Sequence, residues 1–254
     1  SYGAELGFRL PNRFYLDTRY THVKTNRTRP DIPENQDDIY GVQLRWKGSR
    51  FMAARVGYER LNRTAEFAEG GLALSLEPYM RRYDAAAKNR DLYKASLDLF
   101  PTDRLNISFT YRYRDTDYTG TDLGLQRDRR HEFAIDADYL AGKWARLFGF
   151  ADYELIRTDQ FQRQLPLGAA AGFDPSTPPT PTAFNWTAEQ KDRSFGYTLG
   201  SDIYIITGKL TLTVQHSFLK SDGSIDYTYL LGANPLPAGR NQDNIDIGNW
   251  DDYK

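Results

Sequence analysis

The sequence LNISFTYRYRDTDY at residues 105–118 decides the fold, because its side chains alternate in character along the whole segment. Every second position is apolar or aromatic, as at Phe109 and Tyr113, and the positions between are polar, including Arg112 and Arg114. A period of two residues is that of a β-strand whose two faces meet different surroundings. The segment is therefore expected to form a strand with one apolar face and one charged face.

Other segments repeat this alternation, so about ten strands are expected in the chain. The further segments are residues 2–10, 14–20, 40–46, 52–59, 93–99, 132–139, 147–155, 195–205 and 210–218. Most of them approach the length of about nine residues that a tilted strand needs to cross a bilayer. The sequence therefore predicts transmembrane β-strands rather than transmembrane helices.

The connections between the expected strands alternate between short and long. Short turns are expected at 11–13, 47–50, 101–104, 141–144 and 207–209, and long polar connections at 25–38, 60–91, 119–130, 157–193 and 221–249. This order is typical of outer-membrane barrels, which have tight periplasmic turns and longer extracellular loops. A β-sandwich with Greek-key crossovers would not keep it over five hairpins. The predicted fold is all-β, an up-and-down antiparallel transmembrane β-barrel.

The composition agrees with this fold and limits the possible functions. The 254 residues carry a net charge of −1, and 14% of them are aromatic although the mean hydropathy is −0.67. Balanced charge gives no argument for nucleic-acid binding. The absence of cysteine excludes disulfides, thiolate metal sites and covalent attachment of c-type haem on this chain. No cofactor is expected on the chain itself.

The apolar faces of the expected strands carry aromatic residues close to strand ends. Aromatic girdles at both bilayer interfaces are a feature of outer-membrane barrels, where the rings lie between lipid and water. The residues predicted to form these girdles are Tyr20, Tyr40, Trp46, Tyr58, Tyr93, Tyr113 and Tyr139. The apolar faces are expected to contact the lipid of the bacterial outer membrane.

The opposite faces carry charges of both signs. Because an unpaired charge in a dry core costs several kcal/mol, these faces are expected to line a wet or protein-filled lumen, or the outer surface of a soluble sandwich. Mixed charge argues against a pore that is strongly selective for one ion sign. The predicted lumen residues are Arg45, Arg55, Lys94, Asp98, Arg112, Arg114, Asp136, Asp138, Asp152, Glu154 and Asp202.

Catalytic and metal-binding constellations are not evident. Two carboxylate pairs on the lumen faces, Asp136 with Asp138 and Asp152 with Glu154, have the chemistry for acid–base catalysis, but no histidine or serine accompanies them. The acidic segment 243–252 lacks the ligand spacing of a calcium loop. Three histidines are expected to be strand-end residues rather than ligands: His22, His131 and His216. The sequence therefore predicts neither an enzyme nor a metal site.

Residues 80–131 carry a family resemblance. They read MRRYDAAAKNRDLYKASLDLFPTDRLNISFTYRYRDTDYTGTDLGLQRDRRH, with a Pro-x-Asp turn, an Asp-x-Asp-Tyr strand end and a Gly-Leu-Gln loop in that order. The segment resembles the outer-membrane porins of porin–cytochrome complexes, the MtrB/PioB type, also called decahaem-associated outer-membrane proteins. Residues 184–218 look like a later hairpin of this family, with Trp186 before a Lys-Asp-Arg strand start.

The resemblance implies that the barrel is a sheath for another protein. In this family a periplasmic multihaem c-type cytochrome threads through the barrel, where it can meet an extracellular cytochrome. The barrel does no redox chemistry and insulates the haem chain from lipid during extracellular electron transfer. The predicted lumen residues are then the expected contacts with that cytochrome partner, since a wet protein–protein interface is polar and mixed in charge.

Barrels of this family have well over twenty strands, which this chain is too short to supply. Residues 1–254 are therefore expected to form a single barrel domain that is incomplete at one or both ends. A complete barrel of ten to twelve strands is the alternative, and its lumen would be too narrow for a cytochrome. Two other functions stay open at this point: a diffusion porin for small solutes and a soluble β-sandwich that binds a ligand.

Overall fold

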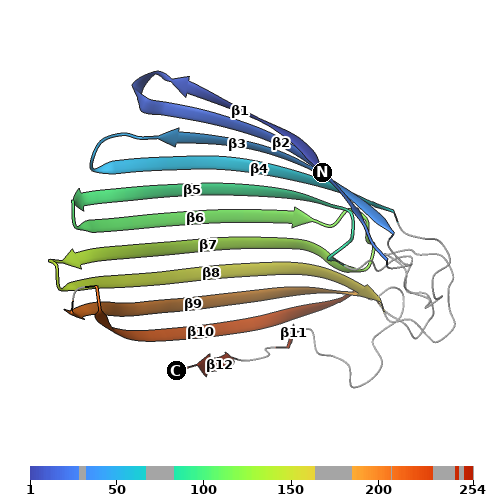
Figure 1. Cartoon of the computed structure of the whole chain (residues 1–254). Helices are drawn as coiled ribbons and strands as arrows, with labels where there is room; N and C mark the ends of the chain where they lie inside the picture. Colours follow the sequence, from blue (N-terminus) through green and yellow to red (C-terminus); the bar gives the residue numbers. More distant parts are fainter. Residues whose placement is uncertain are drawn as a thin grey trace.

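The computed structural model describes residues 1–28, 33–66, 83–163, 185–206, 208–230, 244–245 and 249–253. Within these ranges the chain forms one antiparallel sheet with ten long strands in chain order (Figure 1). The long strands are β1 (Tyr2–Leu10), β2 (Phe14–Asn26), β3 (Glu34–Trp46), β4 (Met52–Glu66), β5 (Lys88–Thr102), β6 (Leu105–Asp117), β7 (Gly124–Ala141), β8 (Ala145–Arg163), β9 (Asn185–Ile206) and β10 (Leu210–Leu230). Two short strands, β11 (Asn244–Ile245) and β12 (Asn249–Tyr253), pair with β10.

Each long strand pairs with the strands that precede and follow it in the sequence, which is the up-and-down topology. The predicted all-β meander is therefore confirmed. One sheet accounts for every strand in the described ranges, which contradicts the alternative of a two-sheet sandwich. In the same ranges β1 pairs with β2 alone, so the sheet is not closed into a complete barrel.

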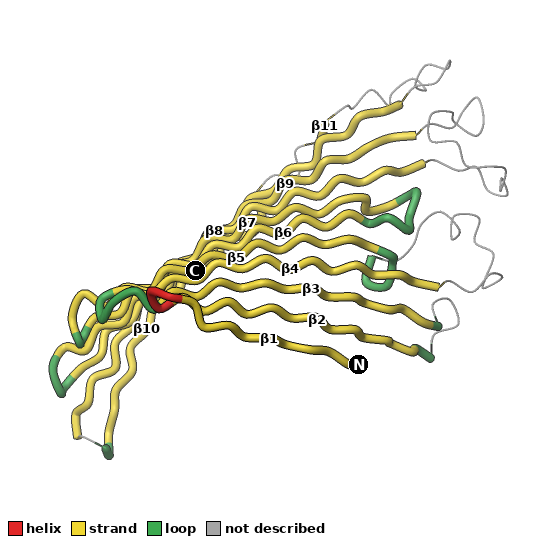
Figure 2. The backbone as a smooth tube through the Cα atoms, turned by 90° about the horizontal axis from the view of Figure 1, so that it is seen from above, coloured by secondary structure: helices red, strands yellow, loops and turns green. Residues whose placement is uncertain are grey.

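Short turns lie at one end of the sheet and the longer connections at the other (Figure 2). The first short turn is the 3-10 segment η1 (Pro11–Arg13), and the turn between β7 and β8 uses Gly142 at φ 74°. A positive φ is readily adopted by glycine, which has no Cβ to clash with the backbone. The turn positions agree with those expected from the sequence.

The predicted long connections are too long, and this part of the prediction is wrong. Strands continue well into them: β3 begins at Glu34, β4 ends at Glu66, and β8 ends at Arg163. In these extensions both faces of the strand are polar, as where Arg157 lies opposite Lys191. The apolar alternation therefore stops at the membrane boundary, although the backbone hydrogen bonding continues beyond it.

The register assigns every side chain to one of two faces, because residues directly opposite each other on neighbouring strands share a face. One such row, from β2 to β9, is Leu16, Leu44, Val56, Ala95, Tyr111, Phe133, Tyr153 and Phe195. The large apolar side chains of this face are open to their surroundings; Leu6 is 60% exposed and Leu199 is 58% exposed. A broad exposed apolar face on a single sheet is what contact with lipid requires.

Candidate functional site: the charged face of the sheet

The charged face is held together by ion pairs that cross from strand to strand. Near the short turns of β2 to β5, Arg45 donates two hydrogen bonds to Asp17, at 2.7 and 2.9 Å. On the neighbouring hairpin Arg55 donates to Asp98 at 3.1 Å and to the hydroxyl of Ser96 at 3.0 Å. Carboxylate–guanidinium pairs that bridge different strands fix the side-chain positions as well as the charges.

The middle of the charged face has a shared carboxylate. Glu59 on β4 accepts hydrogen bonds from Arg19 on β2 and from Arg90 on β5, each at 2.8 Å. The side chain of Glu59 is only 15% exposed, whereas that of Arg19 is 53% exposed. One largely buried carboxylate therefore binds two cations, and the outer part of Arg19 stays exposed.

The pairing continues across β6, β7 and β8. Arg112 contacts Glu132 at 3.3 Å, and Arg114 donates to Asp128 at 3.1 Å. Arg130 lies between Glu132 and Glu154 and pairs with both. Arg112 and Arg114, two of the four arginines that the sequence predicted as partner contacts, are thus already paired within the wall.

Arg146 completes the network at the short-turn end of β8. Its Nε donates to Asp138 on β7 at 2.7 Å, and its Nη1 lies 3.5 Å from Asp202 on β9. Arg146 thus orders two of the predicted contacts, Asp138 and Asp202. Such a bridge over three strands depends on the register and has no signature in the local sequence.

Three predicted lumen residues differ from the others in having no ion pair. Among the described residues, Lys94, Asp136 and Asp152 have no oppositely charged group within ion-pair distance. They lie on β5, β7 and β8, and Lys94 and Asp136 are exposed. The structure therefore separates the eleven predicted contacts into eight residues that are paired within the wall and these three, which have no ion pair among the described residues.

A depression on the charged face was not predicted from the sequence. It has a volume of about 210 Å³ and lies over β1 to β5, where Gly41 and Gly57 leave the backbone uncovered beside Glu59 and Lys94. A Cβ atom at position 57 would lie 3.4 Å from the nearest atom, the carbonyl oxygen of Val42. Glycine inside a strand often marks the close approach of another group, so the signal was present in the sequence.

A second unpredicted feature is a small buried cluster at the long-connection end of the same face. Arg63 donates to both oxygens of Asp37, at 2.6 and 2.7 Å, and to the backbone carbonyl of Asp84 at 2.8 Å. The Nζ atom of Lys88 lies 5.5 Å from the ring centre of Tyr118, which is 8% exposed. Burial raises the pKa of the Tyr118 phenol. Residues 83–87 and 118–123 thus fold against the wall, with Ala85, Ala86 and Leu123 fully buried.

Five of the predicted girdle tyrosines form a row at the long-connection end of the apolar face, in two groups of neighbouring rings. Tyr20 and Tyr40 have ring centres 5.2 Å apart, Tyr58 and Tyr93 are 5.0 Å apart, and Tyr93 and Tyr113 are 6.0 Å apart. The hydroxyls donate away from the apolar band, Tyr20 to Asp38 at 2.7 Å and Tyr58 to Asp91 at 2.6 Å. An apolar ring with its polar end directed to water is the orientation of interfacial tyrosines.

The other two predicted girdle residues, Trp46 and Tyr139, lie at the short-turn end of the same face. On β7 the distance from His131, in the tyrosine row, to Tyr139 is eight residues, or about 27 Å along a strand. With a tilt of about 40° this corresponds to about 20 Å of membrane depth, close to the apolar band of outer-membrane barrels.

Histidines lie within these aromatic rows rather than at a metal site. The His131 ring is stacked on Tyr113 at 4.5 Å, and the His22 ring is stacked on Tyr2 at 4.8 Å. In the part of the chain that the structure describes, no group of three metal-ligating side chains is found. The side chains of the acidic segment 243–252 lie outside the described residues. Within the same ranges, no helix is long and apolar enough to cross a membrane.

A single meander of antiparallel strands, with an apolar face bounded by aromatic rows and a charged opposite face, defines the wall of an outer-membrane β-barrel. The chain belongs to the MtrB/PioB family, described as an outer membrane beta-barrel porin, and the match covers residues 1–254. The family places the protein in the outer membrane.

A search of the curated proteins gave no match. Among solved structures, the siderophore receptor PiuA from Acinetobacter baumannii is similar, with 12% sequence identity and a TM-score of 0.43. The alignment covers 94% of this chain and 50% of the receptor chain, so the chain spans about half the length of that protein.

Proposed function

We propose that this chain is part of a larger barrel whose lumen holds a periplasmic multihaem c-type cytochrome for electron transfer across the outer membrane. The observation that supports the proposal best is the charged face, a wall of ion pairs in which only a few charges stay free. Such a wall is polar and nearly neutral, which suits a wet interface with another folded protein. The barrel itself carries out no redox reaction in this proposal.

Further support comes from the size of the sheet and from the composition. The ten long strands of the described ranges form an open sheet, and a closed barrel of ten strands is too narrow to hold a protein. We infer that residues 1–254 form one domain that further strands complete. Because the chain has no cysteine, any c-type haem in the conduit belongs to the partner.

The depression at Gly41 and Gly57 is the part of the wall best suited to a partner side chain. It lies beside Lys94, one of the three unpaired charges, so an inserted group would meet both exposed backbone and a free ammonium. At the long-connection end of the barrel, which faces the outside in such proteins, an extracellular cytochrome is the expected electron acceptor or donor.

The experiment is a pull-down of the complete barrel, expressed with its native partners and purified in mild detergent, followed by haem staining. A haem-positive band is expected to co-purify with the wild-type barrel. Reversing the three unpaired charges, with Lys94→Glu, Asp136→Lys and Asp152→Lys together, is expected to lower the haem recovered per barrel severalfold. A control with three charge reversals in the short turns, Asp103→Lys, Lys143→Glu and Lys209→Glu, should retain wild-type haem.

Folding of each variant is checked by its heat-dependent mobility on gels, which is independent of the partner. Absence of a haem protein from the wild-type preparation would contradict the proposal. Equal haem recovery from the lumen variant and from wild type would remove these three residues from the contact surface.

A diffusion porin is the second candidate, and the buried cluster of residues 83–87 and 118–123 favours it. Segments that fold against the inner wall narrow the lumen of solute porins. Conductance of the purified barrel in planar bilayers separates the two functions. A porin conducts steadily on its own, whereas a sheath conducts only after its cytochrome has been removed.

A further inference from the structure

The outward face of the sheet changes character abruptly beyond the tyrosine row, at the end with the long connections. Moving outward along β7, β8, β9 and β10, the first charged side chain is a cation on every strand. These residues, here called the cationic rim, are Arg129, Arg157, Arg193 and Lys220. They share a face with the lipid-contacting residues, so their surroundings are the headgroup layer and not the lumen.

The rim is confined to one part of the sheet. On β2 to β6 the signs are mixed: the first charged side chain is a cation on β2 and β4 (Lys24 and Arg60) and an acid on β3, β5 and β6 (Asp38, Asp91 and Asp115). On β7 to β10, by contrast, four neighbouring strands all present a cation first. A non-specific preference of barrels for charge above the girdle would not sort the signs in this way. The sorting indicates that β7 to β10 face an anionic group.

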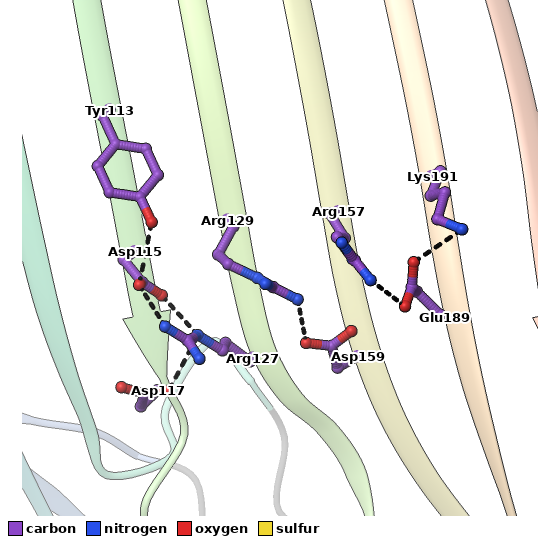
Figure 3. Close-up of polar contacts among 9 residues, drawn as sticks. All are labelled: Tyr113, Asp115, Asp117, Arg127, Arg129, Arg157, Asp159, Glu189 and Lys191. Carbon is purple, nitrogen blue, oxygen red and sulfur yellow. Dashed lines mark hydrogen bonds and ion pairs between the residues drawn. The ribbon is translucent and has the colours of Figure 1, made fainter.

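Like charges also lie directly opposite each other at this level. Arg129 on β7 is paired in register with Arg157 on β8, and Arg157 is paired with Lys191 on β9 (Figure 3). Directly opposite like charges destabilise a sheet. A bound anion that contacts several of them at once would offset this repulsion.

Carboxylates hold the rim from its outer side. Arg129 donates to Asp159 at 2.5 Å, and Arg157 donates to Glu189, both one step further from the membrane (Figure 3). In these bonds each arginine uses a single Nη2 atom. The Nε of Arg129 is buried, so the donors left for a ligand are the Nη1 of Arg129 and the Nε and Nη1 of Arg157. Guanidinium donors held in place by carboxylates in this way are suited to recognising phosphate.

Arg193 is the most open member of the rim. Its side chain is 66% exposed, and its Nε lies 3.5 Å from Asp222, so this pair is weak. Lys191, on the same strand, is 50% exposed. The Nζ atom of Lys191 is bound internally, to Glu189 at 2.9 Å and to Asp226 at 2.8 Å. Arg193 is therefore the cation that can reach a ligand without breaking a strong internal ion pair.

A groove lies in the middle of this group. It has a volume of about 820 Å³ and is lined by Arg129, Arg157, Lys191 and Arg193 at its polar side and by Tyr113 and Leu155 at its membrane side. Two acids, Asp192 and Asp222, also line it, so the four cations outnumber the carboxylates. This volume is in the range of small-molecule sites and is far larger than one phosphate group requires. A phosphorylated sugar headgroup with the start of its acyl chains fits both the size and the change from polar to apolar lining.

We infer that this groove binds the phosphate of an outer-leaflet glycolipid through the cationic rim, with the sugar in the groove and the acyl chains along the apolar face. The long connections of the meander lie on the extracellular side of such barrels, which places the rim at the outer leaflet. Basic pockets at the membrane surface are a known means of recognising anionic headgroups. The inference concerns the outside of the barrel and does not depend on the proposed cytochrome partner.

The test titrates the complete barrel in mild detergent with diphosphoryl lipid A and counts bound lipid by native mass spectrometry. The same lipid with its phosphates removed is the comparison probe. Replacing three rim residues together, by Arg129→Gln, Arg157→Gln and Arg193→Gln, is expected to weaken binding of the phosphorylated lipid about a hundredfold. The matched control, Arg19→Gln with Arg90→Gln and Arg130→Gln, removes the same charge from the opposite face and should bind like wild type.

A charge-preserving variant guards against a purely structural effect. Arg129→Lys with Arg157→Lys and Arg193→Lys is expected to keep binding within about tenfold of wild type, because the cations remain. Inorganic phosphate at the same concentration is expected to leave the lipid bound. Equal binding of phosphorylated and dephosphorylated lipid by wild type would overturn the inference. Equal losses in the rim and control variants, or displacement by inorganic phosphate, would overturn it as well.

Discussion

Replacing Phe109 by arginine tests whether the apolar face contacts lipid. Phe109 lies in the middle of β6, directly opposite Leu97 and Ile135, and is 42% exposed. It is four residues from Tyr113 in the tyrosine row, or about 13 Å along the strand, which places it near the centre of the bilayer. An arginine on the lipid face of a barrel costs about 2–4 kcal/mol at this depth.

This cost corresponds to a change of about 30- to 700-fold in the folding equilibrium. The assay is reversible folding of the complete barrel into lipid vesicles, with guanidinium titration followed by tryptophan fluorescence. Thr110→Arg is the matched control, because Thr110 is the next residue along the strand and lies on the charged face. The control is expected to cost less than about 1 kcal/mol, since lumen positions of barrels tolerate charge.

Equal costs for Phe109→Arg and Thr110→Arg would refute the assignment of the two faces. A small cost for both would mean that neither face contacts lipid at this position. A large cost for both would mean that the charged face is packed against apolar material. The difference between the two variants, rather than either value alone, therefore carries the test.

Three further predictions concern the charged face and its buried cluster. Arg63→Met is expected to destabilise the folded barrel by about 2–3 kcal/mol, measured by denaturant titration, because Asp37 loses both of its guanidinium hydrogen bonds. The pKa of Tyr118 is raised in the folded protein, so its contribution to stability is fully present below about pH 10, the pKa of an unfolded tyrosine, and is lost at higher pH. In Tyr118→Phe, the free energy of unfolding should therefore depend less on pH in this alkaline range. Gly57→Leu fills the depression and should lower haem recovery while leaving thermal stability within about 1 kcal/mol, because Cβ has space at this position; unchanged haem recovery would show that no partner group enters there.

The strands inside the membrane were predictable because their two faces meet different media. Lipid on one side and a polar lumen on the other require apolar and polar residues to alternate along a strand, as in the segment that forms β6. Short turns then separate one such segment from the next. Beyond the membrane both faces meet water, so residues such as Arg157 and Lys191 are polar on a paired strand and resemble a loop in the sequence. For this reason the expected strands ended too early at the long connections.

The charged face was predictable as a set of residues but not as an arrangement. Alternation alone assigned Asp138 and Asp202 to the lumen, yet the bridge that Arg146 makes between them depends on the register of β7, β8 and β9. In the same way, the sequence gives no sign that Arg112 and Arg114 are paired with Glu132 and Asp128 whereas other lumen charges are free.

The sequence by itself determined the strand character, the two faces and the positions of the short turns, because these depend on neighbours a few residues apart. The tertiary structure alone decided which charges neutralise each other, where glycines open the wall, and how Arg129, Arg157 and Arg193 meet around one groove. These features depend on residues brought together by the lateral pairing of strands. That pairing fixes the distances between side chains, and the energy of a charge interaction depends on distance.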